Sequence, residues 1–253
     1  MTAAATGPNG EPELQNHRTI DRVTRILEEV VYNPGMTFAE LTRAIDAPKS
    51  SVYGFIRGLV AAGWLHQADS RFYIGPALHG LTLASGHLRA GSVTDADLQE
   101  LHTAAGVTVF LGVQAGTDLI YVSEAGADLL AGFAARTNIR RGLLETAGGK
   151  ALLAELPADQ RDAYLRKRGQ EEVHLVDEFL SEYDDIKRTG IAHNTLHGGA
   201  RYALATVVRG PGGKAAAEVT LVGRTADVQP RERELSTLLL DHVERWRRRS
   251  GGA

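Results

Sequence analysis

The sequence predicts an α+β protein with an N-terminal winged helix-turn-helix, a linker helix, and a C-terminal domain with an antiparallel sheet and flanking helices. Three observations predict this class. A helix-capping motif at Thr37 begins a series of two helices and a hairpin that is complete by Tyr73. Hairpin patterns mixed with helical patterns follow after residue 92. The 253 residues also suffice for two domains of about 100 to 200 residues each.

The first helix is predicted over residues 17–32. Apolar residues recur there at helical spacing, and Asn33-Pro34-Gly35 ends the helix. The apolar stripe consists of Ile20, Val23, Leu27 and Val30 or Val31. The polar side carries Arg18, Arg22 and Arg25. These arginines face either DNA or solvent, and the sequence leaves both possibilities open.

The second helix is predicted to start at Thr37. Thr37-Phe38-Ala39-Glu40 has the Thr-x-x-Glu pattern of a capping box, in which the Thr hydroxyl and the Glu carboxylate bind free amides at the helix start. Met36 and Leu41 are spaced as a hydrophobic staple. The helix should end near Ile45. Pro48 then suits the first position of the next helix because it lacks an amide hydrogen.

The third helix is the predicted recognition helix. One face is apolar at helical spacing, through Val52, Phe55, Ile56, Leu59 and Val60. The opposite face carries short hydroxyl side chains, a phenol and cations, which suit phosphates and base edges in a major groove. We therefore predict DNA contacts from Thr37, Lys49, Ser50, Ser51, Tyr53, Arg57, Arg71 and Arg22. The alternative is a helix-turn-helix that binds only proteins.

A wing should follow this helix. Gly63 is placed to end the helix as a C′ glycine. Residues 64–67 and 72–74 are predicted strands, joined by Ala68-Asp69-Ser70-Arg71. Arg71 at the tip could reach the DNA backbone or the minor groove.

The remaining chain divides into a linker and a second domain. Leucines at 78, 81, 83 and 88 predict a linker helix over residues 76–91 that is apolar on more than one side, which favours a homodimer or a dimer of dimers. In the second domain, residues 92–249, we predict strands over 107–113, 119–123, 203–208 and 215–222. Helices are predicted from Thr94 and over 151–154, 159–168, 176–189 and 231–249. Residues 17–75 are the predicted DNA-binding domain.

Composition excludes several classes of protein. There is no cysteine, so disulfides, thiol nucleophiles and thiolate metal sites are ruled out. No apolar run approaches the roughly 18 residues of a membrane span. Residues 1–16 are rich in Ala, Gly and Pro and read as a disordered tail, so we expect a cytoplasmic protein without membrane contact. His193 and His197 are four apart, but Gly198-Gly199 disfavours a helix there, so neither a metal nor a cofactor is expected.

Five passages resemble the IclR family of bacterial transcriptional regulators, in collinear order from about Arg18 to Trp246. They are residues 38–52 for the helix-turn-helix, 71–75 for the wing, 144–154 for the effector-domain signature Leu-Glu-Thr-Ala-Gly-Gly-Lys-Ala-Leu-Leu-Ala, 190–192, and 203–205. The resemblance implies a dimerising linker helix and a GAF-like C-terminal domain that binds a small organic acid or a related metabolite.

The resemblance also implies a ligand site. In the family the ligand lies against the backbone that corresponds to Ala147 and Gly148, and against side chains that match Tyr202, Thr220 and Val222. A tight glycine turn entering a helix would present amides to an anion there. We add Asn194 and Phe110 to this candidate set. The bulky Tyr202 and the apolar Val222 favour an aromatic or amide-like effector.

The function predicted from the sequence is a ligand-responsive DNA-binding regulator, a repressor released from its operator by a small organic metabolite. One alternative is a DNA-binding protein without an effector, which a filled second domain would favour. The other is a small-molecule hydrolase with an appended helix-turn-helix. No catalytic residues are assigned, because no nucleophile with a base and an orienting group can be placed from the spacing.

Overall fold

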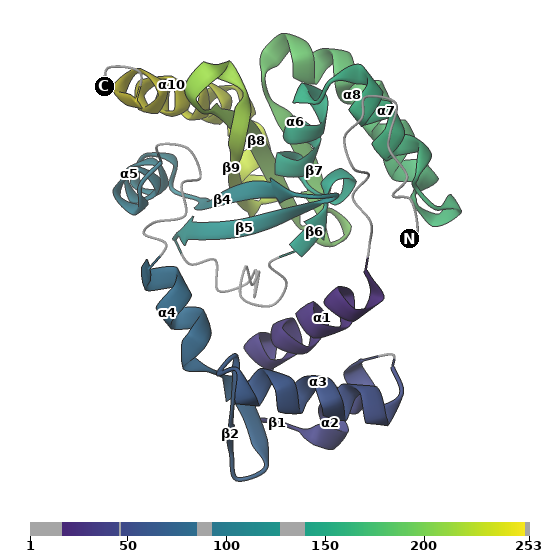
Figure 1. Ribbon diagram of the computed structural model, residues 1–253. Helices are drawn as coiled ribbons and strands as arrows, with labels where there is room; N and C mark the ends of the chain where they lie inside the picture. Colours follow the sequence, from purple (N-terminus) through teal and green to yellow (C-terminus); the bar gives the residue numbers. More distant parts are fainter. Residues whose placement is uncertain (1–16, 46, 85–92, 127–139, 251–253) are drawn as a thin grey trace. The chain divides into compact units, whose positions relative to one another are not determined.

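The computed structural model describes residues 17–45, 47–84, 93–126 and 140–250. The chain divides into two compact units, Met1–His87 and Leu88–Ala253, and each is described by itself. The mixed helix and sheet architecture in Figure 1 confirms the predicted α+β class. The predicted tail, residues 1–16, lies outside the described residues.

The N-terminal unit is a winged helix-turn-helix. Its elements are α1 (Arg18–Tyr32), β1 (Met36–Thr37), α2 (Phe38–Ala44), α3 (Lys49–Ala61), β2 (Leu65–Ala68), β3 (Arg71–Ile74) and α4 (Pro76–Ala84). The strands form an antiparallel sheet in the order β1-β3-β2. Buried apolar residues of α1, α2 and α3 pack against Leu65 and Phe72 of the wing. Strand β1 was not predicted, because a two-residue strand has no periodicity of its own.

The capping box at Thr37 is present. The Thr37 amide and hydroxyl donate to Glu40 Oε2 at 2.7 and 2.8 Å, and the Glu40 amide donates to Thr37 Oγ1 at 3.3 Å. The hydrogen bonds from Thr37 lower the pKa of Glu40. One detail differs from the expectation: Pro48 lies at the N-cap of α3, and Lys49 is the first helical residue.

We expect Thr37→Ala to destabilise the N-terminal unit by about 1 kcal/mol, because the amide of Glu40 loses its acceptor at the start of α2. Hydrogen exchange of the α2 amides in the full chain would measure the change. Thr42→Ala is the matched control, since that hydroxyl only donates back to Phe38 O within α2. Equal protection in the two variants would contradict a capping role.

Glycines shape the wing. Gly63 follows α3 with φ +74°, and the amides of Gly63 and Trp64 donate to Val60 O and Leu59 O at 3.1 and 2.9 Å, as expected for a C′ glycine. At Gly75 a Cβ would collide with the carbonyl oxygen of Gly63. The hairpin turn places Asp69 and Ser70 at positive φ, so the wing has a two-residue turn.

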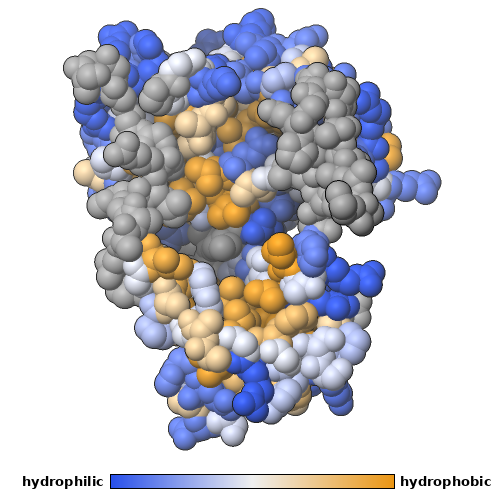
Figure 2. All heavy atoms as spheres, viewed as in Figure 1, coloured by the Kyte–Doolittle hydropathy of each residue, from blue (hydrophilic) through white to orange (hydrophobic). Residues whose placement is uncertain are grey.

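Helix α4 begins at Pro76, where the linker helix was predicted, and residues 85–91 of that prediction lie outside the described residues. Its exposed apolar residues include Leu78 and Leu81, which are 38% and 54% exposed. Hydrophobic residues on the surface of α4 are visible in Figure 2.

The C-terminal unit contains an antiparallel six-stranded sheet in the order β6-β5-β4-β9-β8-β7. Its strands are β4 (Thr108–Ala115), β5 (Asp118–Ala125), β6 (Arg140–Gly142), β7 (Ala192–Leu196), β8 (Arg201–Arg209) and β9 (Ala215–Arg224). Its helices are α5 (Asp95–Ala105), α6 (Ala147–Glu155), α7 (Ala158–Arg166), α8 (Val173–Thr189), α9 (Thr225–Val228) and α10 (Glu232–Ser250). The short strands β6 and β7 were not predicted.

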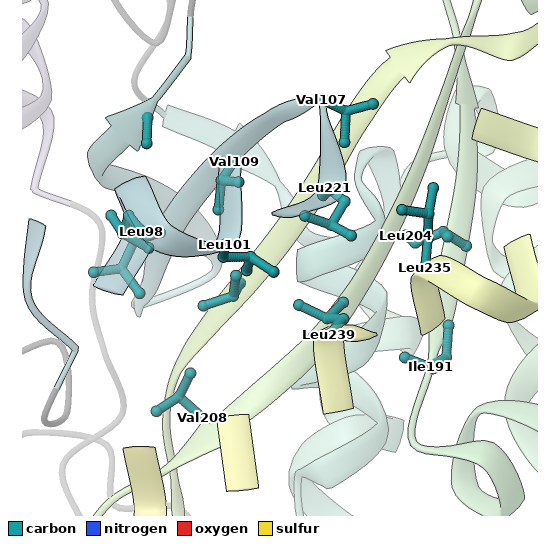
Figure 3. Close-up of a cluster of buried hydrophobic side chains, with 14 of the residues drawn as sticks. Leu98, Leu101, Val107, Val109, Ile191, Leu204, Val208, Leu221, Leu235 and Leu239 are labelled. Carbon is teal, nitrogen blue, oxygen red and sulfur yellow. The ribbon is translucent and has the colours of Figure 1, made fainter. Parts of the chain in front are cut away.

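Both faces of this sheet are covered by helices. One core cluster joins α5 and α10 to Val109, Leu204 and Leu221, as Figure 3 shows. The second cluster joins α6, α7 and α8 to the other face, with Phe110 from β4 and Val222 from β9. Alternate residues of one strand therefore belong to different cores.

Gly148 and Gly149 do not form the expected tight turn. They lie in the first turn of α6, whose N-cap is Thr146. The physical reason is close packing. A Cβ at Gly148 would collide with the carboxyl group of Glu218, and a Cβ at Gly149 would collide with the backbone of Leu143. Both positions exclude a side chain because α6 lies directly against neighbouring elements.

Candidate DNA interface and effector cavity

The outward face of α3 carries the predicted DNA contacts. Lys49, Ser50, Tyr53 and Arg57 are exposed, with Tyr53 51% exposed, and Ser51 is half-buried. The apolar face of the same helix buries Val52, Ile56 and Leu59, as the periodicity predicted. The 13-residue helix therefore holds polar side chains on a rigid element that faces away from the core of its unit.

Tyr53 and Arg57 form a pair on this face. Arg57 Nη1 donates to Tyr53 Oη at 3.3 Å, and the guanidinium carbon lies 5.8 Å from the ring centroid. The hydrogen bond to Tyr53 raises the pKa of Arg57. Tyr53 is itself positioned edge-on against Phe38 of α2, with 5.7 Å between centroids. The pair thus presents a cation whose orientation is constrained by an aromatic ring.

Other predicted contacts have partners within the unit. Thr37 is part of the capping box, and Arg71 Nη1 donates to Gly35 O at 2.7 Å. Arg71 begins β3, directly after the two turn residues. Thr37 therefore caps α2, and Arg71 connects the wing to the residue just before β1.

A basic depression lies beside the N-terminus of α3. The cations that line it come from α1, α2 and α3, and Asp21 is the acid among its lining residues. They are Arg18, Arg22, Arg25, Arg43 and Lys49. Arg22 was a predicted contact, whereas Arg43 was missed, because nothing local in the sequence shows that the end of α2 approaches α1.

A small cavity lies in the second core of the C-terminal unit. Its volume is about 10 Å³, which is room for about one water molecule. It is lined by Phe110, Tyr121, Thr146, Ala147, Leu196, Ala203, Thr220 and Val222. Four of the predicted ligand-binding residues are thus brought together: Phe110, Ala147, Thr220 and Val222.

The other predicted ligand-binding residues do not line the cavity. Gly148 packs on Glu218, next to the cavity. Asn194 Nδ2 donates to Glu145 O at 2.7 Å and so fixes the segment before α6. Tyr202 belongs to the opposite core and donates to Glu232 at 3.0 Å, while its neighbour Ala203 faces the cavity. The spacing of residues along β8 could not show whether Tyr202 or Ala203 faces the cavity.

Sequence reasoning missed a buried carboxyl group beside the cavity. Glu218 is 0% exposed, and burial raises its pKa to about 8. Thr220, which lines the cavity, lies 2.6 Å from Glu218 Oε2. The sequence could have indicated this residue. Side chains alternate between the two faces of a strand, so residue 218 lies on the same face as the predicted site residues 220 and 222.

The described residues hold neither a metal-binding cluster nor a membrane-spanning element. No three His, Asp or Glu side chains among them are arranged to bind a metal ion. None of the described helices has the length and hydrophobicity that crossing a lipid bilayer requires.

Comparison with known proteins decides the nature of the N-terminal unit. Residues 19–69 match the model of the IclR helix-turn-helix domain. This segment is similar to the helix-turn-helix domain of the IclR family. The predicted resemblance is therefore confirmed for this segment. Curated protein sequences gave no match.

Solved structures of IclR regulators share the fold of the whole chain. A regulator from Alicyclobacillus acidocaldarius is 18% identical with a TM-score of 0.68, and the match covers 92% of this chain and 98% of that one. An IclR regulator from Brucella abortus is 16% identical with a TM-score of 0.69, covering 96% and 95%. An IclR homologue from Microbacterium hydrocarbonoxydans, solved with 4-hydroxybenzoate, is 19% identical with a TM-score of 0.67, covering 89% and 95%.

Proposed function

We propose that this chain is a ligand-responsive transcriptional regulator that binds operator DNA through α3. The observation that carries the proposal is the exposed row of Lys49, Ser50, Tyr53 and Arg57 on the third helix of an IclR helix-turn-helix domain. Side chains of these types bind phosphates and base edges when a recognition helix enters a major groove. Such a protein acts in the cytoplasm, and the proposed sign of control is repression.

The proposed active species is a homodimer or a dimer of dimers. Leu78 and Leu81 on α4 expose apolar surface that a second copy of α4 would cover. Two recognition helices would then meet half-sites in successive major grooves.

The proposed effector site is the cavity beside α6. It collects Phe110, Ala147, Thr220 and Val222 in one place, and a homologue of the same fold was solved with 4-hydroxybenzoate. A small organic metabolite in this cavity would change operator affinity by a coupling typically of about 1 to 3 kcal/mol. We propose that its binding releases the repressor from DNA.

One observation favours a second candidate, a DNA-binding protein without an effector. The cavity of about 10 Å³ has room for one water, so an aromatic ligand must widen it. The discriminating experiment is a mobility-shift titration of genomic operator fragments with and without a library of small organic acids and amides. An operator affinity that no compound changes would favour the second candidate.

Arg57→Ala should weaken specific operator binding about 10- to 100-fold, because one base-reading cation is worth roughly 1 to 3 kcal/mol. The side chain is exposed, so the fold should not change. Mobility-shift titrations at fixed salt would measure the affinity. The matched control is Arg233→Ala, an exposed arginine on α10. Equal affinity of Arg57→Ala and wild type would remove Arg57 from the interface.

A further inference from the structure

The basic depression beside the N-terminus of α3 concentrates positive charge in a chain whose net charge is −3. Its volume is about 800 Å³. Five of its lining residues are cations, and Asp21 is the one acid among the described residues that line it. The depression therefore carries an excess of positive charge that the composition of the whole chain does not suggest. Such a surface attracts an anionic partner.

The cations of this depression are not neutralised by carboxylates. Arg25 Nη2 donates to Ala44 O at 3.1 Å, and Arg43 Nε donates to Ala39 O at 3.3 Å, so both bind backbone carbonyls. Within the described part of the chain, none of the five cations forms an ion pair with an acid. Arginines of α10 differ, since three of them lie 3.0 Å or less from a carboxylate. They are Arg245, Arg247 and Arg249.

Three of the cations follow one stripe of α1. Arg18, Arg22 and Arg25 occupy positions i, i+4 and i+7 of the helix. Like charges at this spacing repel one another and weaken a helix when no anion lies beside them. The stripe is about 10 Å long, at a rise of about 1.5 Å per residue. A DNA strand carries one phosphate for about every 3.4 Å of its axis, so the stripe can contact more than one phosphate.

The depression is continuous with the exposed row of α3. Lys49 belongs to both, because it is the first residue of α3 and also lines the depression. Arg43 reaches the same place from the end of α2. The phosphate backbones border the grooves of a DNA duplex. A duplex that receives α3 in its major groove therefore brings phosphates next to the start of that helix.

We propose that the basic depression is a second DNA contact, which binds backbone phosphates through Arg18, Arg22 and Arg43 beside the row on α3. The inference rests on the proposed function, in which α3 enters a major groove. Phosphate contacts fix the register and orientation of a protein on a duplex, and they carry no sequence information. The depression supplies affinity and salt dependence, whereas α3 supplies the preference for an operator.

The test is a double variant that removes two exposed cations, Arg18→Gln/Arg43→Gln. Fluorescence anisotropy of the full chain would measure its affinity for a duplex of arbitrary sequence and for an operator fragment selected from genomic DNA. For both duplexes, the slope of log affinity against log salt should become shallower by about 1.8 per bound protomer, about 0.9 for each lost phosphate contact. Affinity at about 0.1 M salt should fall at least about tenfold. The ratio of the two affinities should change less than about threefold.

Three further variants separate the proposed role from other effects. Arg166→Gln/Arg233→Gln makes the same change of net charge at exposed arginines of the C-terminal unit and should leave the slope unchanged. Arg18→Lys/Arg43→Lys should restore most of the slope, because lysine binds phosphate as a point charge. Arg57→Ala should instead reduce the preference for the operator over the arbitrary duplex.

Several results would overturn the proposal. One is an unchanged salt slope in Arg18→Gln/Arg43→Gln, and another is an equal change in Arg166→Gln/Arg233→Gln. A third is binding of poly-glutamate that requires Arg18 and Arg43 while DNA affinity does not, which would indicate an acidic protein partner. If wild type bound no duplex at about 0.05 M salt, the proposed function would fail together with this inference. A shallower slope in the variant without any operator preference in wild type would support the phosphate contact and refute the regulator.

Discussion

Glu218→Gln should raise the free energy of unfolding of the C-terminal unit by about 3 kcal/mol at pH 7. Folded Glu218 has its pKa raised to about 8 by complete burial, whereas the unfolded side chain has the ordinary value of 4.5. Between these values the unfolded chain has released a proton that the folded chain still holds. Stability therefore falls as pH rises from about 4.5 to about 8 and then levels off. Gln carries no charge and removes this loss.

The measurement is urea denaturation at pH 5, 7 and 9 followed by fluorescence of Trp246, which is buried in the C-terminal unit. A Trp64→Phe background removes the signal of the N-terminal unit. The free energies of unfolding of wild type and Glu218→Gln should be nearly equal at pH 5 and should diverge as the pH rises above 5. Glu171→Gln, which replaces an exposed carboxyl group, should follow wild type at every pH. Parallel pH profiles for Glu218→Gln and wild type would show that Glu218 is ionised in the folded protein.

Local signals in the sequence were sufficient for the N-terminal unit. The capping box at Thr37 and the glycine after α3 act through residues three to five positions away, and both are found where they were predicted. Strand β1 was missed because it is defined by its pairing with β3, in which Met36 lies opposite Phe72. A two-residue strand has no sequence pattern that indicates a partner so far along the chain.

The cavity beside α6 could be predicted only in part, since its walls come from several strands and one helix. Thr220 and Val222 were identified by the family resemblance, and their alternation along one strand places both on the face that lines the cavity. The period of two could not decide whether Tyr202 or Ala203 faces the cavity, and the structure selects Ala203. The glycines before Lys150 were interpreted as a turn. Glycine is required at these two positions because Glu218 and Leu143, which lie on other elements, leave no room for a Cβ atom.

Replacement of Lys150 should cause the largest loss of stability. Its side chain is 0% exposed, and its Nζ lies 2.5 Å from Glu178 Oε1 and 3.0 Å from Glu182 Oε2. It also donates to His193 O at 3.5 Å, so one ammonium group connects α6 to α8 and β7. Lys150→Ala would remove the buried stem and leave Glu182, which is 17% exposed, without its cation. Removing one partner of a buried pair typically costs about 3 to 5 kcal/mol.

A second lysine provides the matched control. Lys187 on α8 bonds Glu155 on α6 at 2.9 Å, but its side chain is 42% exposed, and exposed pairs contribute at most about 1 kcal/mol. Urea denaturation at pH 7 should therefore show a loss of about 3 kcal/mol for Lys150→Ala and less than about 1 kcal/mol for Lys187→Ala. The loss for Lys150→Met should lie between these two values, because methionine keeps the apolar stem and removes only the charge. Since both lysines join α6 to α8, equal losses would mean that contact between the helices, rather than burial of the charge, determines the stability of this face.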